Sequence, residues 1–264
     1  MPLPPRSELQ CVTFDCWATL IHEAGIARGN GRGRILAEFC GRTEQEAGAA
    51  LSAAFREHQI AWHRQRVFDG ADMTRHALAA LGVSTDAARF EELLTALEEE
   101  ILSHDVRAIA GARELLVALR DAGVRRALIC DTGFTPGRMV RRLLDRVGLL
   151  ELLEVTIFSD EVRVPKPHPK AFSEALRGVG VSAQHACHVG DLRRSDIAGA
   201  RSAGMYAIRF SGWHDDRDTH DGGKANVIDC STASCNPPCE RPEADAVVST
   251  YPQLAALLEL PRTR

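Results

Sequence analysis

Residues 11–20 read Cys-Val-Thr-Phe-Asp-Cys-Trp-Ala-Thr-Leu, and they begin with a short apolar run that ends at Asp15. Short runs of this kind, with β-branched residues and flanking turn or helical segments, are typical of buried strands. Three later runs have the same character, at residues 126–130, 154–158 and 186–189. Amphipathic stretches that predict helices lie among them, at residues 112–122, 138–150 and 169–179.

This alternation of strand and helix determines the expected fold class. A strand that returns parallel to its predecessor through a helix does so with a right-handed crossover, and both faces of the sheet are then covered by helices. The sequence therefore predicts an α/β fold built on a doubly wound parallel sheet. Two further apolar runs, at residues 205–210 and 246–248, are candidates to extend that sheet.

One long segment interrupts the alternation. Residues 25–104 are rich in Ala, Leu, Glu and Arg and have a helical pattern throughout, with predicted helices at residues 32–40, 44–67, 73–81 and 87–103. We expect them to form an inserted helical cap domain. Residues 1–24 and 105–264 then form the α/β core, with an irregular insertion at residues 211–245.

The overall composition excludes several classes of protein. Hydrophobic residues make up 45% of the 264 residues and charged residues 26%, and the net charge is −4. A chain with this charge has no basic footprint for nucleic acid, and it has no apolar run of about 18 residues that would cross a membrane. Residues 1–10 lack the apolar core of a secretory signal, so we expect a cytoplasmic protein. The sequence does not indicate the oligomeric state.

The eight cysteines divide into two groups. The first five, Cys11, Cys16, Cys40, Cys130 and Cys187, stand singly in apolar surroundings, as reduced thiols do. Cys230, Cys235 and Cys239 have spacings near those of zinc sites, and His214 or His220 would be candidates for a fourth ligand. The pattern is loose, so we expect a surface insertion with incidental thiols and no zinc.

Aspartates follow all four of the predicted strands that come first. They are Asp15, Asp131, Asp160 and Asp191, with Asp196 close behind. The carboxyl ends of parallel strands share one edge of the sheet, where ligands bind. Crowded carboxylates repel one another unless one is protonated or a cation lies among them. Ligand sets made only of oxygen atoms favour a hard cation such as Mg²⁺, which commonly accompanies phosphate.

Four segments in this order resemble the haloacid dehalogenase (HAD) superfamily of hydrolases, most of whose members are phosphatases. The segments are residues 14–20 (Phe-Asp-Cys-Trp-Ala-Thr-Leu), residues 130–135 (Cys-Asp-Thr-Gly-Phe-Thr), Lys166-Pro167, and Gly190-Asp191 with Asp196 beyond. The resemblance covers residues 10–20 and 108–210, while the cap matches in position and character. It implies a Rossmann-like core with a helical cap inserted after the first motif.

The resemblance also implies a role for each motif residue. Asp15 would attack phosphorus and form an aspartyl phosphate that water then hydrolyses. Mg²⁺ would be held by Asp15, Asp191 and the backbone carbonyl of Trp17, with Asp196 supporting the metal site. Thr132 and Lys166 would bind the phosphoryl group of a small phosphorylated metabolite.

This sequence departs from the family pattern in two places. Most family phosphatases place a second aspartate two residues after the nucleophile, and here Trp17 stands there as a wall of the substrate pocket or a packing residue. Either a cap residue such as His58 or His63 supplies the acid, or the leaving group is good, or catalysis is slow. Cys130 and Asp131 also stand where many relatives have Ser or Thr. Thr132 is our choice for the phosphate-binding hydroxyl, because it begins a Thr-Gly-aromatic-Thr run similar to that of phosphonate-cleaving relatives. The cap stretch at residues 62–66 could face the substrate, but a solvated helix face has the same pattern and is what we expect.

Other functions stay open beside a Mg²⁺-dependent phosphatase. A 2-haloacid dehalogenase would use Asp15 to attack carbon and displace halide, and those relatives also lack the second aspartate. They need no metal and do not keep the motif seen here as Gly190-Asp191, so phosphoryl chemistry is favoured. Cleavage of a C–P bond through a cap lysine is disfavoured because no lysine precedes Lys166. A weakly active or non-catalytic binding protein on this scaffold is the remaining alternative.

Overall fold

The protein is described here from a computed structural model that places residues 5–24, 31–216 and 243–260. A parallel six-stranded sheet forms its core, in the order β5-β4-β1-β6-β7-β8. The strands are β1 (Cys11–Phe14), β4 (Arg125–Cys130), β5 (Val155–Phe158), β6 (Ala186–Gly190), β7 (Tyr206–Phe210) and β8 (Ala246–Val248). The predicted doubly wound α/β fold is confirmed, with both additional strands in place.

Strand β1 lies near the centre of this sheet and is buried along its whole length. Its side chains alternate between two separate hydrophobic clusters, because neighbouring residues of a strand point to opposite faces. Val12 and Phe14 pack into one cluster and Cys11 into the other. Burial on both faces explains why the strands read as continuous apolar runs rather than alternating ones.

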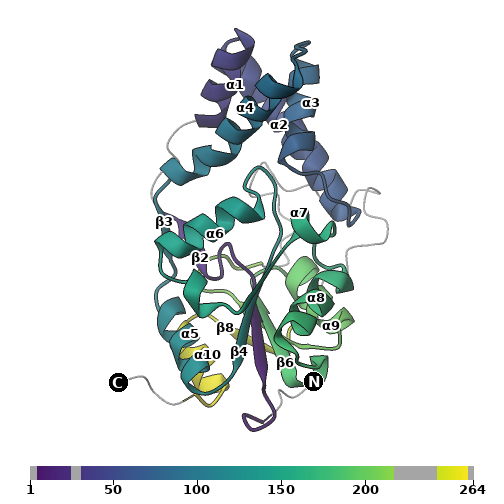
Figure 1. The fold of residues 1–264 in the computed structure, drawn as a ribbon. Helices are drawn as coiled ribbons and strands as arrows, with labels where there is room; N and C mark the ends of the chain where they lie inside the picture. The colour runs from purple at the N-terminus through teal and green to yellow at the C-terminus, as the bar shows by residue number, and fades with distance from the viewer. Residues whose placement is uncertain (1–4, 25–30, 217–242, 261–264) are drawn as a thin grey trace.

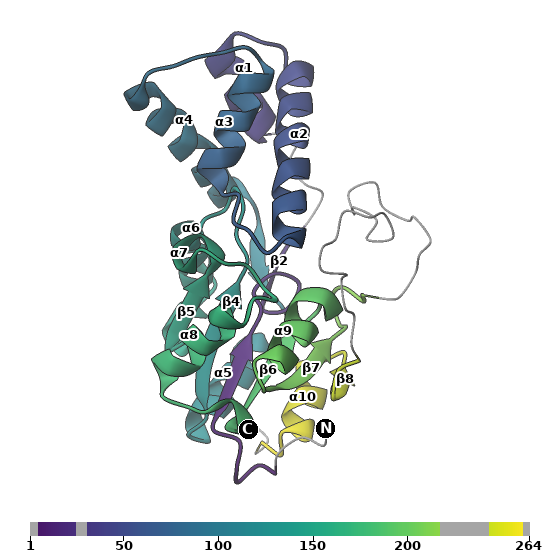
Figure 2. The same cartoon turned by 90° about the vertical axis from the view of Figure 1, so that its right-hand side faces the viewer.

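Helices cover the two faces of the sheet (Figures 1 and 2). The larger cluster is closed by α5 (Ala112–Asp121), α6 (Gly137–Arg146) and α10 (Tyr251–Leu257), and the smaller by α8 (Pro169–Val179) and α9 (Ala198–Ser202). A short helix, α7 (Ser159–Val162), follows β5. Within the described residues, no helix is both long and apolar enough to span a bilayer.

The inserted helices form a second layer above the carboxyl ends of the strands (Figure 1). They are α1 (Gly31–Cys40), α2 (Glu44–His63), α3 (Gly70–Ala80) and α4 (Ala87–Glu99). Leu36, Ala54, Met73 and Leu97 contribute to a hydrophobic cluster separate from those of the core. The helical cap is thus confirmed as an insertion, while the exact residue boundaries of the two domains stay a prediction.

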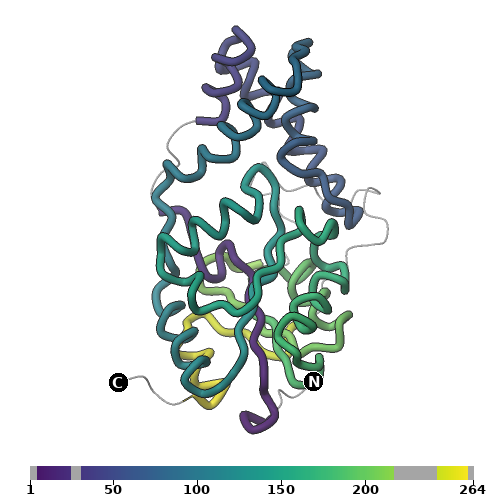
Figure 3. The backbone as a smooth tube through the Cα atoms, viewed as in Figure 1, coloured from purple at the N-terminus to yellow at the C-terminus, as the bar shows by residue number. Residues whose placement is uncertain are grey.

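A two-stranded antiparallel ribbon, which the sequence did not indicate, connects core and cap. Strand β2 (Ile21–Glu23) pairs with β3 (Val106–Ala108), and the amide of Ala24 donates to the carbonyl of Asp105 over 2.7 Å. Figure 3 shows the backbone leaving the core beside the point where it returns. Each strand is three residues long, which is too short for a periodic pattern to be visible.

Three predicted helices end several residues earlier than expected. Helix α4 ends at Glu99 rather than residue 103, and a 3-10 helix follows at Glu100–Ser103. Helix α2 ends at His63 rather than residue 67, because Gln65 takes a left-handed backbone conformation with φ 54°. Helix α6 ends at Arg146 rather than residue 150, and Gly148 follows with φ 69°. Residues in the left-handed conformation terminate helices. Where such a residue is not glycine, the pattern of apolar and polar side chains does not indicate it.

Candidate active site

Three buried aspartates meet at the carboxyl ends of the central strands. Asp15 follows β1, Asp191 follows β6, and Asp196 lies in a turn of π-helix at Arg193–Ile197. One ligand atom from each lies within 4.8 Å of those of the other two, so the three can hold a single metal ion. These are the three carboxylates that the sequence resemblance assigned to a metal.

Lys166 lies between two of these carboxylates. Its Nζ donates to Asp15 Oδ1 at 2.5 Å and to Asp196 Oδ1 at 2.7 Å, and its side chain is 2% exposed. Burial alone would lower the pKa of Lys166, but Asp15, Asp196 and Asp131 outweigh it and raise that pKa well above its usual value. Lys166 is therefore a fixed positive charge beside Asp15.

The positive charge of Lys166 does not offset the effect of burial on Asp15. Burial raises its pKa to about 8, with a further contribution from Asp196 and Asp191, although Lys166 opposes the shift. Burial likewise raises the pKa of Asp191. A carboxyl that resists ionisation in this way is stabilised as the anion when a cation joins the cluster.

Asp196 is held as the anion by several donors. Besides Lys166, it accepts hydrogen bonds from the amide of Leu192 at 2.9 Å and from His188 Nε2 at 3.2 Å. Burial alone would raise the pKa of Asp196, but Lys166 and His188 together hold it below its usual range. A Cβ on Gly190 would lie 2.3 Å from Asp196 Cγ, so this turn requires glycine at the end of β6.

His188 and His214 are site residues that the sequence analysis missed in these roles. His188 is fully buried on β6, where its Nδ1 lies 2.8 Å from the hydroxyl of Thr13. His214 lies beyond β7, and its Nδ1 donates to Asp191 Oδ2 at 2.8 Å. The one signal for His188 in the sequence is a histidine within an apolar strand. His214 was considered only as a zinc ligand. The other residues of that possible zinc site, Cys230, Cys235, Cys239 and His220, lie outside the described residues.

Asp131 connects the core to the cap. Its Oδ1 accepts from the amide of Lys166 at 2.9 Å, and its Oδ2 accepts from Trp62 Nε1, on α2, at 2.7 Å. The guanidinium of Arg194 stacks on the same indole at 3.4 Å from its centroid. Trp62 thus contacts the core, and the expectation of a solvated helix face is wrong for this residue.

The other strand-end residues are used elsewhere. The hydroxyl of Thr132 donates to Asp160 Oδ1 at 2.9 Å and lies 2.9 Å from the hydroxyl of Ser159. Asp160 also accepts from the amide of Gly137, at the start of α6. Asp131 and Asp160 therefore do not belong to the carboxylate cluster, and a phosphate-binding role for Thr132 stays a prediction.

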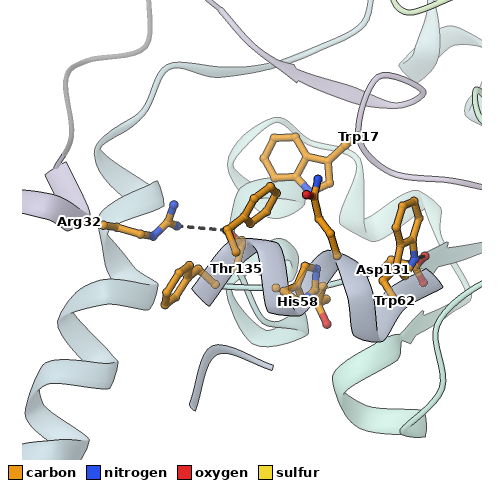
Figure 4. Close-up of a pocket in the computed structure, with 11 residues that line it drawn as sticks. Trp17, Arg32, His58, Trp62, Asp131 and Thr135 are labelled. Atoms are coloured by element: carbon orange, nitrogen blue, oxygen red, sulfur yellow. Dashed lines mark hydrogen bonds between the residues drawn. The ribbon is translucent and has the colours of Figure 1, made fainter. Parts of the chain in front are cut away.

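A cavity of about 350 Å³ lies between α2 and the loop that follows β4. Aromatic side chains dominate its wall, and polar groups come from both layers (Figure 4). It is lined by Trp17, Arg32, Phe55, His58, Gln59, Trp62, Asp131, Thr132, Gly133, Phe134 and Thr135. Trp17 thus forms part of the wall of a cavity, which is one of the two roles considered for it. Of the two cap histidines considered, His58 lines the cavity and His63 does not.

Curated relatives of this chain include phosphatases. A probable phosphoglycolate phosphatase from Pseudomonas putida is 32% identical over 186 residues, which are 68% of this chain and 72% of that protein. A glyceraldehyde 3-phosphate phosphatase from Pyrococcus abyssi is 40% identical over 105 residues, or 40% of this chain, and the match spans only 43% of that relative's length.

Solved structures show the same architecture. A 2-haloacid dehalogenase from Pseudomonas syringae pv. tomato aligns over 95% of this chain and 98% of its own, with a TM-score of 0.65 and 23% identity. A family profile described as haloacid dehalogenase-like hydrolase matches residues 9–204. With the strand order, the inserted cap and the motif residues at the strand ends, this match shows that the chain belongs to the haloacid dehalogenase-like hydrolase family.

Proposed function

We propose that this protein is a Mg²⁺-dependent phosphatase of a small phosphorylated metabolite, with Asp15 as the nucleophile. The observation that carries the proposal is the buried cluster of Asp15, Asp191 and Asp196 with Lys166 against two of its members. Curated relatives named as phosphatases support the same reading. The identity of the metabolite is left open, because the cap determines it.

The donor set fits Mg²⁺ better than a softer metal. The three ligand atoms are all carboxylate oxygens, which suit a hard cation. The raised pKa of Asp15 indicates a cluster with too little positive charge when no ion is bound. When bound, Mg²⁺ would neutralise the carboxylates and polarise the phosphoryl oxygens. The backbone carbonyl of Trp17 remains a further expected ligand.

The chain's own residues would divide the chemistry as follows. Asp15 attacks phosphorus through one carboxylate oxygen, forming an aspartyl phosphate, and the leaving oxygen takes the electron pair of the broken P–O bond. Lys166 stands beside that carboxylate and stabilises negative charge on the transferring group. Lys166 and His188 keep Asp196 ionised and in place. Water then cleaves the aspartyl phosphate and regenerates Asp15.

A 2-haloacid dehalogenase is the second candidate, and one observation favours it. The cavity wall carries Trp17, Phe55, Trp62 and Phe134, which suits an apolar substrate. In that reaction Asp15 would attack carbon and halide would leave without a proton. The gathering of three carboxylates favours the phosphatase, because displacement of halide needs no metal ligands.

A release assay separates the two. Purified protein is incubated with a panel of phosphorylated metabolites and 2-haloacids, each with Mg²⁺ and with a chelator, and free phosphate and halide are measured. We expect phosphate release that requires Mg²⁺ and is lost in Asp15→Asn. Halide release that persists in chelator would overturn the phosphatase in favour of the dehalogenase. An inactive protein on the whole panel would support a binding role.

A further inference from the structure

An alkyl phosphate ester must gain a proton as its alcohol leaves. An alkoxide is a strong base, so it departs slowly unless an acid protonates it, and the second half of the reaction needs a base that activates water. Lys166 is poorly placed to give up a proton, because its ammonium donates to both Asp15 and Asp196. The proton donor must therefore come from elsewhere.

The cavity under the cap contains three titratable side chains: Arg32, His58 and Asp131. Both carboxylate oxygens of Asp131 already accept hydrogen bonds, from the amide of Lys166 and from Trp62. Arg32 donates to the carbonyl of Leu97 and to the hydroxyl of Thr135, and a guanidinium stays protonated at any physiological pH. His58 is the remaining candidate.

One nitrogen of His58 is committed and the other is available. Its Nδ1 lies 2.7 Å from the backbone carbonyl of Phe68. A carbonyl oxygen only accepts, so Nδ1 carries a proton, and Nε2 is the nitrogen that gains and loses one. Among the described residues, Nε2 has no hydrogen-bond partner, and His58 is half-buried rather than sealed in the cap.

Nε2 of His58 lies against the loop that follows β4. It lies 3.5 Å from the point where a Cβ on Gly133 would stand, so a side chain at that position would crowd the ring. His58 and Trp17 line the same cavity (Figure 4). Trp17 follows the nucleophile by two residues, and Asp131, another lining residue, accepts from the amide of Lys166. The wall shared with the imidazole therefore includes a chain neighbour of Asp15 and a hydrogen-bond partner of Lys166.

We propose that His58 is the general acid and base of the reaction, supplied by cap helix α2. This inference rests on the proposed phosphatase function. In the first half, Asp15 bonds to phosphorus, the P–O bond to the alcohol breaks, and Nε2–H of the imidazolium gives its proton to the leaving oxygen. In the second half, neutral Nε2 takes a proton from water as its oxygen bonds to phosphorus, and the electron pair of the Asp15–phosphorus bond returns to the carboxylate. The products are the alcohol and inorganic phosphate, and His58 ends as the imidazolium.

The test compares an alkyl phosphate with p-nitrophenyl phosphate, whose leaving group departs without a proton. His58→Gln keeps a polar side chain of similar length but cannot exchange protons. For the alkyl ester, kcat/KM should fall by about 10²- to 10⁴-fold. For p-nitrophenyl phosphate, kcat/KM should fall by less than about tenfold. Because hydrolysis of the aspartyl phosphate is slowed, rapid mixing should then show a burst of one p-nitrophenolate per chain.

Two further variants complete the experiment. His76→Gln changes another cap histidine, which packs edge-on against Phe68 and is not a lining residue of the cavity; it should leave both esters unaffected. Added imidazole should restore part of the alkyl activity of His58→Ala, with folding checked by circular dichroism. An equal fall of kcat/KM for both esters in His58→Gln, or no fall, overturns the role of His58 while the phosphatase stands. A parent enzyme that hydrolyses neither ester overturns the proposed function and this assignment together.

Discussion

The indole Nε1 of Trp62 donates a 2.7 Å hydrogen bond to Oδ2 of Asp131, and this bond joins the last turn of cap helix α2 to the loop after β4. The other oxygen of Asp131 accepts from the amide of Lys166. Asp131 therefore contacts both the cap, through Trp62, and the segment that carries Lys166. The position of the cap against the core and the placement of Lys166 should depend on each other.

Removing that bond should weaken catalysis without unfolding the protein. Trp62→Phe keeps an aromatic face for Arg194 but leaves a buried carboxylate oxygen without its donor. Hydrogen bonds to charged groups contribute about 1.5–3 kcal/mol, so kcat/KM should fall by about ten- to a hundredfold. Steady-state kinetics measure it. Trp213→Phe is the matched control, because the ring of Trp213 packs on that of His22 and Trp213 does not line the cavity. An equal effect of both changes would contradict the link.

Asp15→Asn should abolish turnover and stabilise the metal-free protein at neutral pH. The folded protein binds the proton of Asp15 more tightly than the unfolded chain does, since its pKa is raised from 3.8 to about 8. The tighter binding of this proton therefore stabilises the folded protein fully below pH 3.8, and the stabilisation is lost as the pH rises through about 8. An amide does not ionise, so the variant avoids this loss.

Urea denaturation in chelator measures the effect, at about pH 5 and about pH 8. The free energy of unfolding of the variant should exceed that of the parent by more at the higher pH. A gap that is constant or that shrinks with pH would show that Asp15 ionises freely in the fold. Turnover within tenfold of the parent would remove Asp15 from the mechanism.

Magnesium should raise the thermal stability of the parent but not of Asp191→Asn. A ligand that binds only the folded state stabilises it by about 2.7 kcal/mol at a concentration a hundred times its Kd. Differential scanning calorimetry with and without Mg²⁺ gives the shift in Tm. Asp160→Asn should lower stability, because Asp160 accepts from Thr132 and Gly137, yet keep the Mg²⁺ shift. A shift that survives in Asp191→Asn would place the ion elsewhere.

Trp17→Asp should compensate for the loss of His58. It places a carboxyl two residues after the nucleophile, within the same cavity wall. In a His58→Gln background, we expect part of the about 10²- to 10⁴-fold loss on alkyl phosphates to return, with little change for p-nitrophenyl phosphate. The measurement is the ratio of kcat/KM for the two esters. Loss of activity on both esters would instead show that the indole is needed as a pocket wall.

Much of the fold could be predicted because each buried strand is a separate apolar run with a turn behind it. The carboxylate cluster could be predicted for a related reason. Asp15 follows such a run directly and Asp191 follows one after Gly190, and parallel strands bring those ends together. Asp160 also follows a strand, yet its side chain serves the start of α6. Position after a strand predicts the edge of the sheet, whereas the direction of a side chain depends on local donors.

Contacts between residues of separate elements could not be predicted from the sequence. Trp62 occupies a helix end among polar neighbours, and nothing in its own segment shows that a core aspartate faces it. His214 contacts Asp191 from a segment with no motif spacing. Both contacts depend on tertiary packing, which periodicity within one element does not encode.

The ribbon of β2 and β3 makes the cap an insert in a hairpin. Ala24 and Asp105, which flank the predicted ends of the cap, are already hydrogen-bonded neighbours. Antiparallel strands in that position can be joined by a two-residue turn, so the whole helical layer could be cut out and the chain rejoined without moving either strand. Caps of other lengths could be grafted at the same junction. The scaffold thus lets the cap be exchanged as a module, while the carboxylates and Lys166 stay on the part that is kept.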